Sequence, residues 1–598
     1  MDERYLHGLI ADVRAGRLTR REFTRIMVGL GLTAPLAAHM LSAAGVAAQP
    51  RPDAFTPSRR GGGSPLKVLW WQAPTLLNPH FAVGTKDQDG SRVFYEPLGA
   101  FDPEGNLFPI LAQEIPTLQN GGVARDGKSV TWKLKRDVSW HDGKPFTADD
   151  LVFNWEYAAD PATAAVTITT YRDIERVEKL DPHTVKLVFK NPTPFWFDAF
   201  CGARGMIIPK HLFQAFKGDR SREAPTNLKP VGTGPYRFVD FKPGDLVRGE
   251  INPAYHVSNR PFFDQFEMKG GGDAASAARA VLQTGEYDFA WNLQVADENL
   301  KRFEQGGKGH VDIATGGAIE HIQLNNTDPW KELDGERSSL KTTHPFLTDP
   351  AVRGALNLLV DRGAIHEELY GRLGQATPNF LNGPPRFRSP NTRWEFSIDK
   401  GNQMLDTAGW KRGTDGVRAK DGKRLKVVFQ TSINPERQKT QAVVKQACAK
   451  AGIDVELKSV VASVFFSSDV ANPDTYTKFY ADLQMYTVGP GAPDPQTFMS
   501  NFISAEICSK ENKWARRNTT RWRNEEYDRL WKAAESEIDP VRRAGLIIRM
   551  NDMLTQNVVV VPIIWRNAVA GVSNRLKGND LSGWDSYLWR LAYWYRQP

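Results

Sequence analysis

Segments with the two-residue period of strands alternate with segments of helical period along most of the chain. The strand-like ranges include 66–71, 184–189, 425–429 and 454–457, and the helix-like ranges include 273–284, 349–362 and 440–451. In one of the latter, Val352, Ala355, Leu356 and Leu359 fall on a single helical face. This alternation over 598 residues predicts an α/β protein built from several compact units.

The composition excludes several classes of protein. Hydrophobic residues make up 41% and charged residues 24%, which is typical of a globular chain rather than a fibrous or disordered one. Only range 26–48 lacks charge for about twenty residues, so many membrane spans are not expected. The net charge of +8 is thin for this length, and the densest basic run, 516–523, is short. We therefore expect no nucleic-acid partner.

Three cysteines occur, Cys201, Cys448 and Cys508, and they lie far apart. Without a C-x-x-C pair, neither a zinc knuckle nor a thioredoxin-like motif can be drawn. One disulfide and three buried thiols both remain open.

The N-terminal segment has the order of an export signal. Paired arginines, Arg20 and Arg21, are followed by Phe23, then by the weakly hydrophobic range 26–41 and the small-residue range 43–48. The two arginines with the nearby Phe resemble a twin-arginine signal. The alternative is a membrane-anchoring helix, which the Pro and His within the hydrophobic range disfavour. We expect a cleaved signal and a periplasmic protein without a lipid anchor.

Two segments resemble enzyme motifs, but the residues around or within them do not fit those motifs. Range 122–129 reads GVARDGKS and fits the phosphate-loop pattern, but range 130–135 after it has the period of a strand instead of a helix. Range 366–370 reads HEELY and lacks the second histidine of a zinc protease motif. Asp149 and Asp150 stand where acidic residues favour a helix start. We expect no catalytic residue, no cofactor and no metal; a secreted hydrolase, the alternative, requires a catalytic constellation that is not visible.

A long block carries a family resemblance. Residues 130–153 read VTWKLKRDVSWHDGKPFTADDLVF and closely resemble the signature of the family 5 extracellular solute-binding proteins, the oligopeptide, dipeptide and nickel receptors of ABC importers. Shorter segments follow the family in the expected order: LNP at 77–79, PILAQE at 109–114, VGTGPY at 231–236, GEYD at 285–288, PFLTDPAVR at 345–353, LDTAGW at 405–410 and PIIW at 562–565.

The resemblance implies a two-lobed periplasmic-binding-protein fold of the large type, with an extra subdomain inserted in lobe I. Solute would bind between the hinged lobes, whose closure an inner-membrane ABC permease with its ATPases would read. We expect a monomer with this division: 1–48 signal peptide, 49–64 flexible lead-in, 65–105 lobe I, 106–229 inserted subdomain, 230–315 lobe I, 316–565 lobe II and 566–598 C-terminal return to lobe I.

The resemblance also points to the ligand. In peptide receptors of the family, a carboxylate in a lobe II loop pairs with the α-ammonium of the peptide. The matching loop, 485–498, reads MYTVGPGAPDPQTF, which places Gly491 at that position; Asp494 either substitutes for the carboxylate or caps a turn. The full set of predicted ligand residues is Trp71, Gln72, Thr75, Trp291, Asn292, Asn325, Tyr486, Pro490, Gly491 and Asp494. A peptide or peptide-like solute is the first expectation; an opine, a modified amine or an oligosaccharide, and a sensory partner in place of a permease, stay open.

Overall fold

The computed structural model describes residues 3–14, 17–18, 22–23, 26–27 and 55–597. Arg20 and Arg21 of the predicted export signal lie outside the described residues. Phe23 is described, and its buried side chain belongs to a small cluster with Ile10 and Val13 of helix α1 (Glu3–Arg14). Within the described part of the chain, no helix has the length and apolar character needed to cross a membrane.

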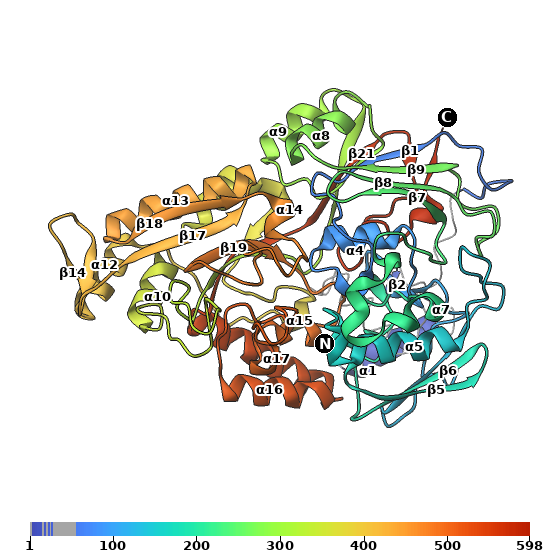
Figure 1. Ribbon diagram of the computed structural model, residues 1–598, viewed down its shortest axis with the longest axis horizontal. Coiled ribbons are helices and arrows are strands. Elements are labelled where there is room, and N and C mark those ends of the chain that lie inside the picture. Colours follow the sequence, from blue (N-terminus) through green and yellow to red (C-terminus); the bar gives the residue numbers. More distant parts are fainter. Residues whose placement is uncertain (1–2, 15–16, 19–21, 24–25, 28–54, 598) are drawn as a thin grey trace.

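Two separate sheets organise the chain (Figure 1). The first has seven strands in the order β11 (Gly309–Ala314), β21 (Ala568–Ser573), β10 (Phe289–Ala290), β1 (Leu66–Leu69), β9 (Gln265–Lys269), β8 (Leu246–Ile251) and β7 (Tyr236–Lys242). Strand β1 runs parallel to both β9 and β10, and the other pairs are antiparallel. Helices α8 (Ala274–Leu282) and α9 (Asp297–Glu304) pack against this sheet.

The second sheet has six strands in the order β13 (Gly374–Ala376), β20 (Val560–Arg566), β12 (Ile319–Leu324), β19 (Leu483–Val488), β17 (Lys426–Ser432) and β18 (Asp454–Val460). The helices around it include α10 (Pro350–Leu358), α12 (Ile398–Thr407), α13 (Pro435–Ala451), α16 (Glu525–Ser536) and α17 (Pro540–Gln556). Each sheet is covered by its own hydrophobic core, so the chain forms two lobes. Here lobe I contains the seven-stranded sheet and lobe II the six-stranded sheet.

Two short segments connect the sheets. Residues 315–318 lead from β11 to β12, and Asn567 alone separates β20 from β21. Paired short crossings of this kind let two rigid bodies rotate about one axis. The two-lobed α/β architecture implied by the resemblance is therefore confirmed.

A third unit lies between β1 and β7 in sequence and packs on lobe I (Figure 1). It holds a three-stranded sheet in the order β4 (Ser129–Lys133), β6 (Thr184–Phe189) and β5 (Ile174–Asp181), with helix α5 (Ala148–Ala159). We call this unit the insert. The predicted start of α5 is confirmed: Thr147 and Asp150 form a reciprocal cap. Gly127, with φ +67°, turns directly into β4, as the strand period predicts, so no phosphate loop forms there.

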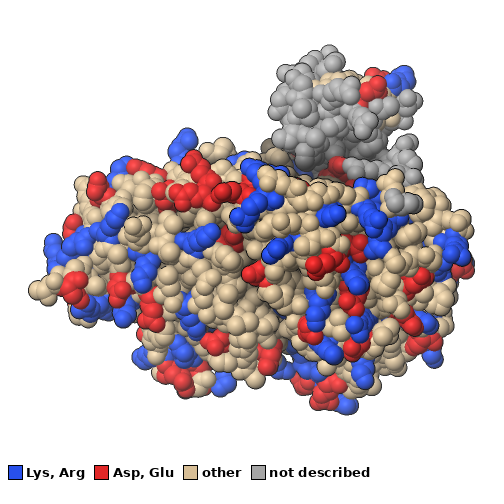
Figure 2. Space-filling model, turned by 90° about the horizontal axis from the view of Figure 1, so that it is seen from above, with Lys and Arg blue, Asp and Glu red and all other residues tan. Residues whose placement is uncertain are grey.

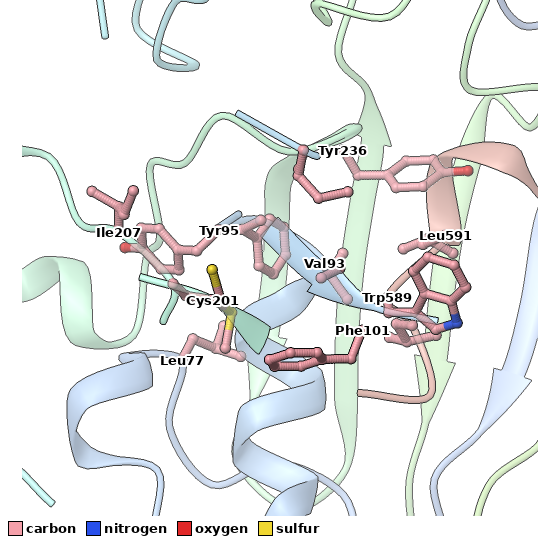
Figure 3. Close-up of a cluster of buried hydrophobic side chains, with 14 of the residues drawn as sticks. Leu77, Val93, Tyr95, Phe101, Cys201, Ile207, Tyr236, Trp589 and Leu591 are labelled. Atoms are coloured by element: carbon pink, nitrogen blue, oxygen red, sulfur yellow. The ribbon is translucent and has the colours of Figure 1, made fainter. Parts of the chain in front are cut away.

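The last segment of the chain returns to lobe I. Figure 3 shows Trp589 and Leu591 in one buried cluster with Val93, Tyr95 and Cys201. The Arg92 guanidinium donates to the Trp589 carbonyl at 3.0 Å. All three cysteines are buried and free, as in the alternative of buried thiols.

Element boundaries differ from the sequence patterns where capping residues decide them. Helix α13 begins at Pro435, five positions before the predicted range, because Asn434 caps it and Pro435 suits its first turn. The predicted helix 349–362 is shorter, and α10 ends at Leu358. Basic and acidic side chains intermingle over the face in Figure 2, in line with the small net charge.

Candidate ligand site between the lobes

The insert and lobe I both contact lobe II. Arg172 of the insert forms an ion pair with Glu506 of lobe II at 2.5 Å, and Thr497 of lobe II donates to Asp198 of the insert at 2.9 Å. Nearer the hinge, the backbone N–H of Ala296 donates to Glu436 at 3.0 Å. The lobes are thus closed on one another, and the side chains at this interface are the candidates for holding a solute.

The lobe I residues predicted from strand ends come together. Trp71 follows β1, and Trp291 and Asn292 follow the neighbouring parallel strand β10. The Trp71 indole N–H lies 3.1 Å from the carbonyl oxygens of both Trp291 and Asn292, and the two indole rings are 6.0 Å apart. The Trp291 indole N–H and the Gln72 amide nitrogen are buried and have no hydrogen-bond partner among the described residues. These groups remain free to bind a polar atom.

Thr75 is held by a buried ion pair. Its N–H and hydroxyl both approach Asp87 Oδ1, at 2.7 and 3.2 Å, and the Lys86 ammonium donates to Thr75 Oγ1 at 2.9 Å. Lys86 and Asp87 are themselves paired at 2.8 Å and almost fully buried. This network fixes the loop after β1.

The lobe II residues predicted as ligand contacts differ in how they are used. Tyr486 is buried, and its hydroxyl accepts a hydrogen bond from the Gln323 amide at 3.0 Å. The Asn325 amide donates to Ser338 and to two backbone carbonyls, so it joins loops within lobe II. Asp494 caps the following turn, accepting from the Gln496 N–H at 2.9 Å, and pairs with Arg543 at 2.5 and 2.8 Å. The turn-capping alternative for Asp494 is thus confirmed, and its carboxylate is already paired.

Pro490 and Gly491 lie where lobe II meets lobe I and the insert. A Cβ placed on Gly317 would clash with the Pro490 ring, and one placed on Gly202 of the insert would lie 3.6 Å from the Gly491 carbonyl. Gly491 has φ +67°, a backbone conformation that favours glycine. The absence of side chains at Gly202 and Gly491 allows these two loops to approach closely.

An aromatic wall in lobe II was not predicted. It consists of Phe465, Phe466, Tyr476 and Tyr486, with the Tyr476 and Tyr486 rings 4.8 Å apart. A Cβ on Gly84 of lobe I would lie 3.7 Å from the Phe466 Cβ, so the wall reaches across the interface. Phe465 ends the four-residue helix α14 (Ala462–Phe465), and Phe466 and Tyr476 lie in the irregular segment between α14 and β19, so no periodic pattern marks them.

A buried charge network supports the wall. Arg437 pairs with Glu320 at 2.8 Å, and Arg566 donates to Thr487 at 3.0 Å while lying 3.8 Å from Glu320. Burial alone would raise the pKa of Glu320, but the two guanidinium groups hold that pKa below its ordinary value. The Arg437 guanidinium also lies 5.9 Å from the Phe466 ring centroid.

Three more unpredicted arginines meet where the insert faces lobe II: Arg172, Arg204 and Arg517. A Cβ on Gly491 would lie 3.8 Å from the Arg204 guanidinium carbon. Arg517 donates from Nε to the Thr169 hydroxyl of the insert at 2.9 Å. Their positions in the sequence are too far apart for any local pattern to group them.

A cavity of about 560 Å³ opens beside the hinge, lined by both lobes. Its walls include Trp565, Trp584, His310 and Asp312, and none of the ten predicted ligand residues lines it. His310 and Asp312 are paired at 3.2 Å. Among the residues that the structure describes, no group of three or more His, Cys, Asp or Glu side chains is placed to hold a metal ion.

Known proteins resemble this chain over most of its length. The oligopeptide-binding protein AppA of Bacillus subtilis is 28% identical over 477 residues, covering 78% of this chain and 79% of that protein. The glutathione-binding protein GsiB of Escherichia coli K12 is 25% identical over 515 residues, covering 84% and 89%. The structure of AppA in complex with a nonapeptide superposes with a TM-score of 0.76 at 24% identity, covering 91% of this chain and all of that one.

The family comparison covers both the insert and most of lobe II. Residues 107–507 match the bacterial extracellular solute-binding proteins, family 5 Middle. That range is more than half of the chain and contains the signature block, the hinge crossing at 315–318 and the loop around Gly491. The chain therefore belongs to the family 5 bacterial extracellular solute-binding proteins.

Proposed function

We propose that this protein is a periplasmic receptor that captures a peptide or peptide-like solute between its two lobes and delivers it to an ABC importer. The observation that carries the proposal is the pair of α/β lobes, joined by two short crossings and meeting through aromatic and polar side chains from both sides. The relatives named above are binding proteins for an oligopeptide and for glutathione, which is itself a short peptide.

Capture follows from the geometry. A solute that contacts both lobes makes its full set of contacts only when they are closed, so it shifts the open–closed equilibrium by its differential affinity. The closed form then presents a surface, drawn from both lobes, that an inner-membrane permease with its ATPases can distinguish from the empty receptor. No step requires a bond to break in the solute.

We assign the predicted residues to two roles. Trp71, Gln72, Trp291 and Asn292 contact the solute from lobe I, and Tyr486, Pro490 and Gly491 contact it from lobe II. Thr75, Asn325 and Asp494 hold the loops in place, because their polar atoms are already engaged. We keep the division of the chain into signal, lead-in, lobes and insert as predicted, with export by the twin-arginine-type signal and a monomeric mature protein.

The test begins with the protein purified from the periplasm. Small molecules that co-purify are released by unfolding and identified by mass spectrometry, and binding of each is then measured by calorimetry on the refolded protein. We expect a peptide-like compound that is recovered intact after incubation. A solute converted into another compound would favour the secreted hydrolase, and an opine, amine or oligosaccharide would replace the peptide in the proposal.

A further inference from the structure

We propose that Arg204 and Arg517 form an anion-binding site that receives a carboxylate of the captured solute. The two residues belong to opposite sides of the closing interface, one in the insert and one in lobe II. This inference rests on the proposed function, because it names the chemical class of the solute that the receptor takes.

The first argument is that the guanidinium groups of Arg204 and Arg517 have no paired carboxylate within the described part of the chain. Arg204 makes no hydrogen bond to any described residue, and its Nη1 atom is buried. Toward the described residues, Arg517 donates only from its Nε, to the Thr169 hydroxyl. Glu506, the acid whose charge acts on Arg517, is already paired with Arg172 at 2.5 Å. Guanidinium groups have five N–H donors in a planar fork that suits a carboxylate, and most of those on Arg204 and Arg517 are unused among the described residues.

The second argument is that the neighbouring acid in the insert does not offset this charge. Asp198 accepts a hydrogen bond from Thr497 and lies close enough to Arg204 to interact electrostatically. Burial, and next the charge of Asp494, raise the pKa of Asp198 above its ordinary value, which favours its neutral form. Burial, and next the charge of Arg204, lower the pKa of Arg517 to about 9, so it remains cationic at neutral pH.

The third argument is access and surroundings. Arg204 and Arg517 are half-buried rather than enclosed. Both lie in electrostatic range of Tyr476, whose ring is 4.8 Å from that of Tyr486, a residue proposed to contact the solute. An anion held here therefore continues into the surface that would hold the rest of a peptide-like molecule.

The fourth argument is the residue opposite. The resemblance places the ammonium-binding carboxylate of peptide receptors at Gly491, and here that position carries no charge and faces the Arg204 guanidinium. The local charge is thus reversed relative to a site for an α-ammonium. Closing the lobes without a ligand brings two cations together, whereas a bound carboxylate turns that repulsion into attraction.

The experiment compares two pools of tripeptides with the same sequences, one with free C-terminal carboxylates and one with amidated ends, by tryptophan fluorescence of the full exported protein. We expect the free-acid pool to bind about ten-fold or more tightly than the amidated pool, from the usual strength of charge-assisted hydrogen bonds. The preference should vanish in Arg204→Gln and in Arg517→Gln, and should persist in Arg529→Gln, which removes an exposed arginine of lobe II.

Two further variants keep the inference falsifiable if those proteins fold poorly. Gly491→Asp places a carboxylate beside Arg204 and should abolish the preference for the free-acid pool, while Gly491→Asn, with the same backbone demand, should retain it. Equal binding of both pools by the wild type overturns the anion site and leaves the proposed function intact. Binding of neither pool contradicts the peptide solute of the proposed function, and this inference with it.

Discussion

The ion pair between Arg172 and Glu506 should hold the closed state, and replacing Arg172 by alanine should weaken solute binding. The Arg172 side chain is 25% exposed and that of Glu506 is 1% exposed, so Arg172→Ala leaves a buried carboxylate without its cation when the lobes close. The Arg172 guanidinium also lies 5.5 Å from the Trp531 ring centroid in lobe II. When the lobes are open, water can hydrate both partners.

The magnitude follows from these contacts. A hydrogen bond between charged groups contributes about 2 kcal/mol, and a partly exposed cation–π contact about 0.5 kcal/mol. Relief of the repulsion between Arg172 and Arg517 returns about 1 kcal/mol, which leaves about 1.5 kcal/mol against closure. Since apparent affinity scales with the closed population, the dissociation constant for the co-purified solute should rise about ten-fold.

The assay is calorimetry with that solute, together with small-angle X-ray scattering of the free protein to follow the open fraction. The matched control is Arg176→Ala, because Arg176 pairs only with Glu175 and Glu178 among the described residues, all within the same exposed strand of the insert. Glu506→Gln combined with Arg172→Ala should recover part of the loss. If Arg172→Ala and Arg176→Ala bind the solute equally well, the interlobe pair does not control closure.

Three further predictions concern stability. Trp132→Ala removes a fully buried side chain of β4 and should lower the free energy of unfolding, measured by urea titration, by about 3–5 kcal/mol. The control Leu180→Ala, at an exposed position, should change that free energy little, and equal effects of the two variants would contradict the packing of the insert. Arg543→Gln leaves the buried Asp494 carboxylate without its ion-pair partner and should lower the free energy of unfolding by about 3 kcal/mol. Adding Asp494→Asn should restore part of that loss, and no restoration in the double variant would mean that the two side chains do not interact. Burial lowers the pKa of His80 from 6.5 to about 4, so the unfolded chain binds the proton more readily and the protein should become less stable as pH drops from about 6.5 to 4. In His80→Gln the melting temperature should depend less on pH in that window, and an unchanged dependence would refute the lowered pKa of His80.

Local structure was predictable where residues a few positions apart decide it. The reciprocal cap at Thr147 and the turn at Gly127 followed from short patterns, because the groups that bond are neighbours in sequence. The grouping of Trp71 with Trp291 was also predictable in part, since both follow strands of one sheet. The two-lobed arrangement was predicted from the family signature alone, because the period of hydrophobic residues indicates single strands and helices but not which distant strands pair.

The arginines between the insert and lobe II could not be found in this way. Arg172 and Glu506 are 334 positions apart, and Arg517 and Thr169 are 348 positions apart. No local sequence pattern around these four residues predicts either contact. From the sequence, the segment that contains Arg517 is only a short basic run. Asn325 shows the converse: its amide suits a ligand contact by type, yet the structure uses it to join loops.

Strand β21 lies between β11 and β10 in the seven-stranded sheet, although it is among the last strands to be synthesised. The ribosome must therefore release nearly the entire polypeptide before lobe I can assemble, and until then the edges of β10 and β11 stay open to wrong partners. The export by a twin-arginine-type signal that we propose would suit this order of assembly, if that route accepts a chain whose core is already complete. Shortening the chain ahead of residue 568 should accordingly remove the whole lobe rather than trim its end.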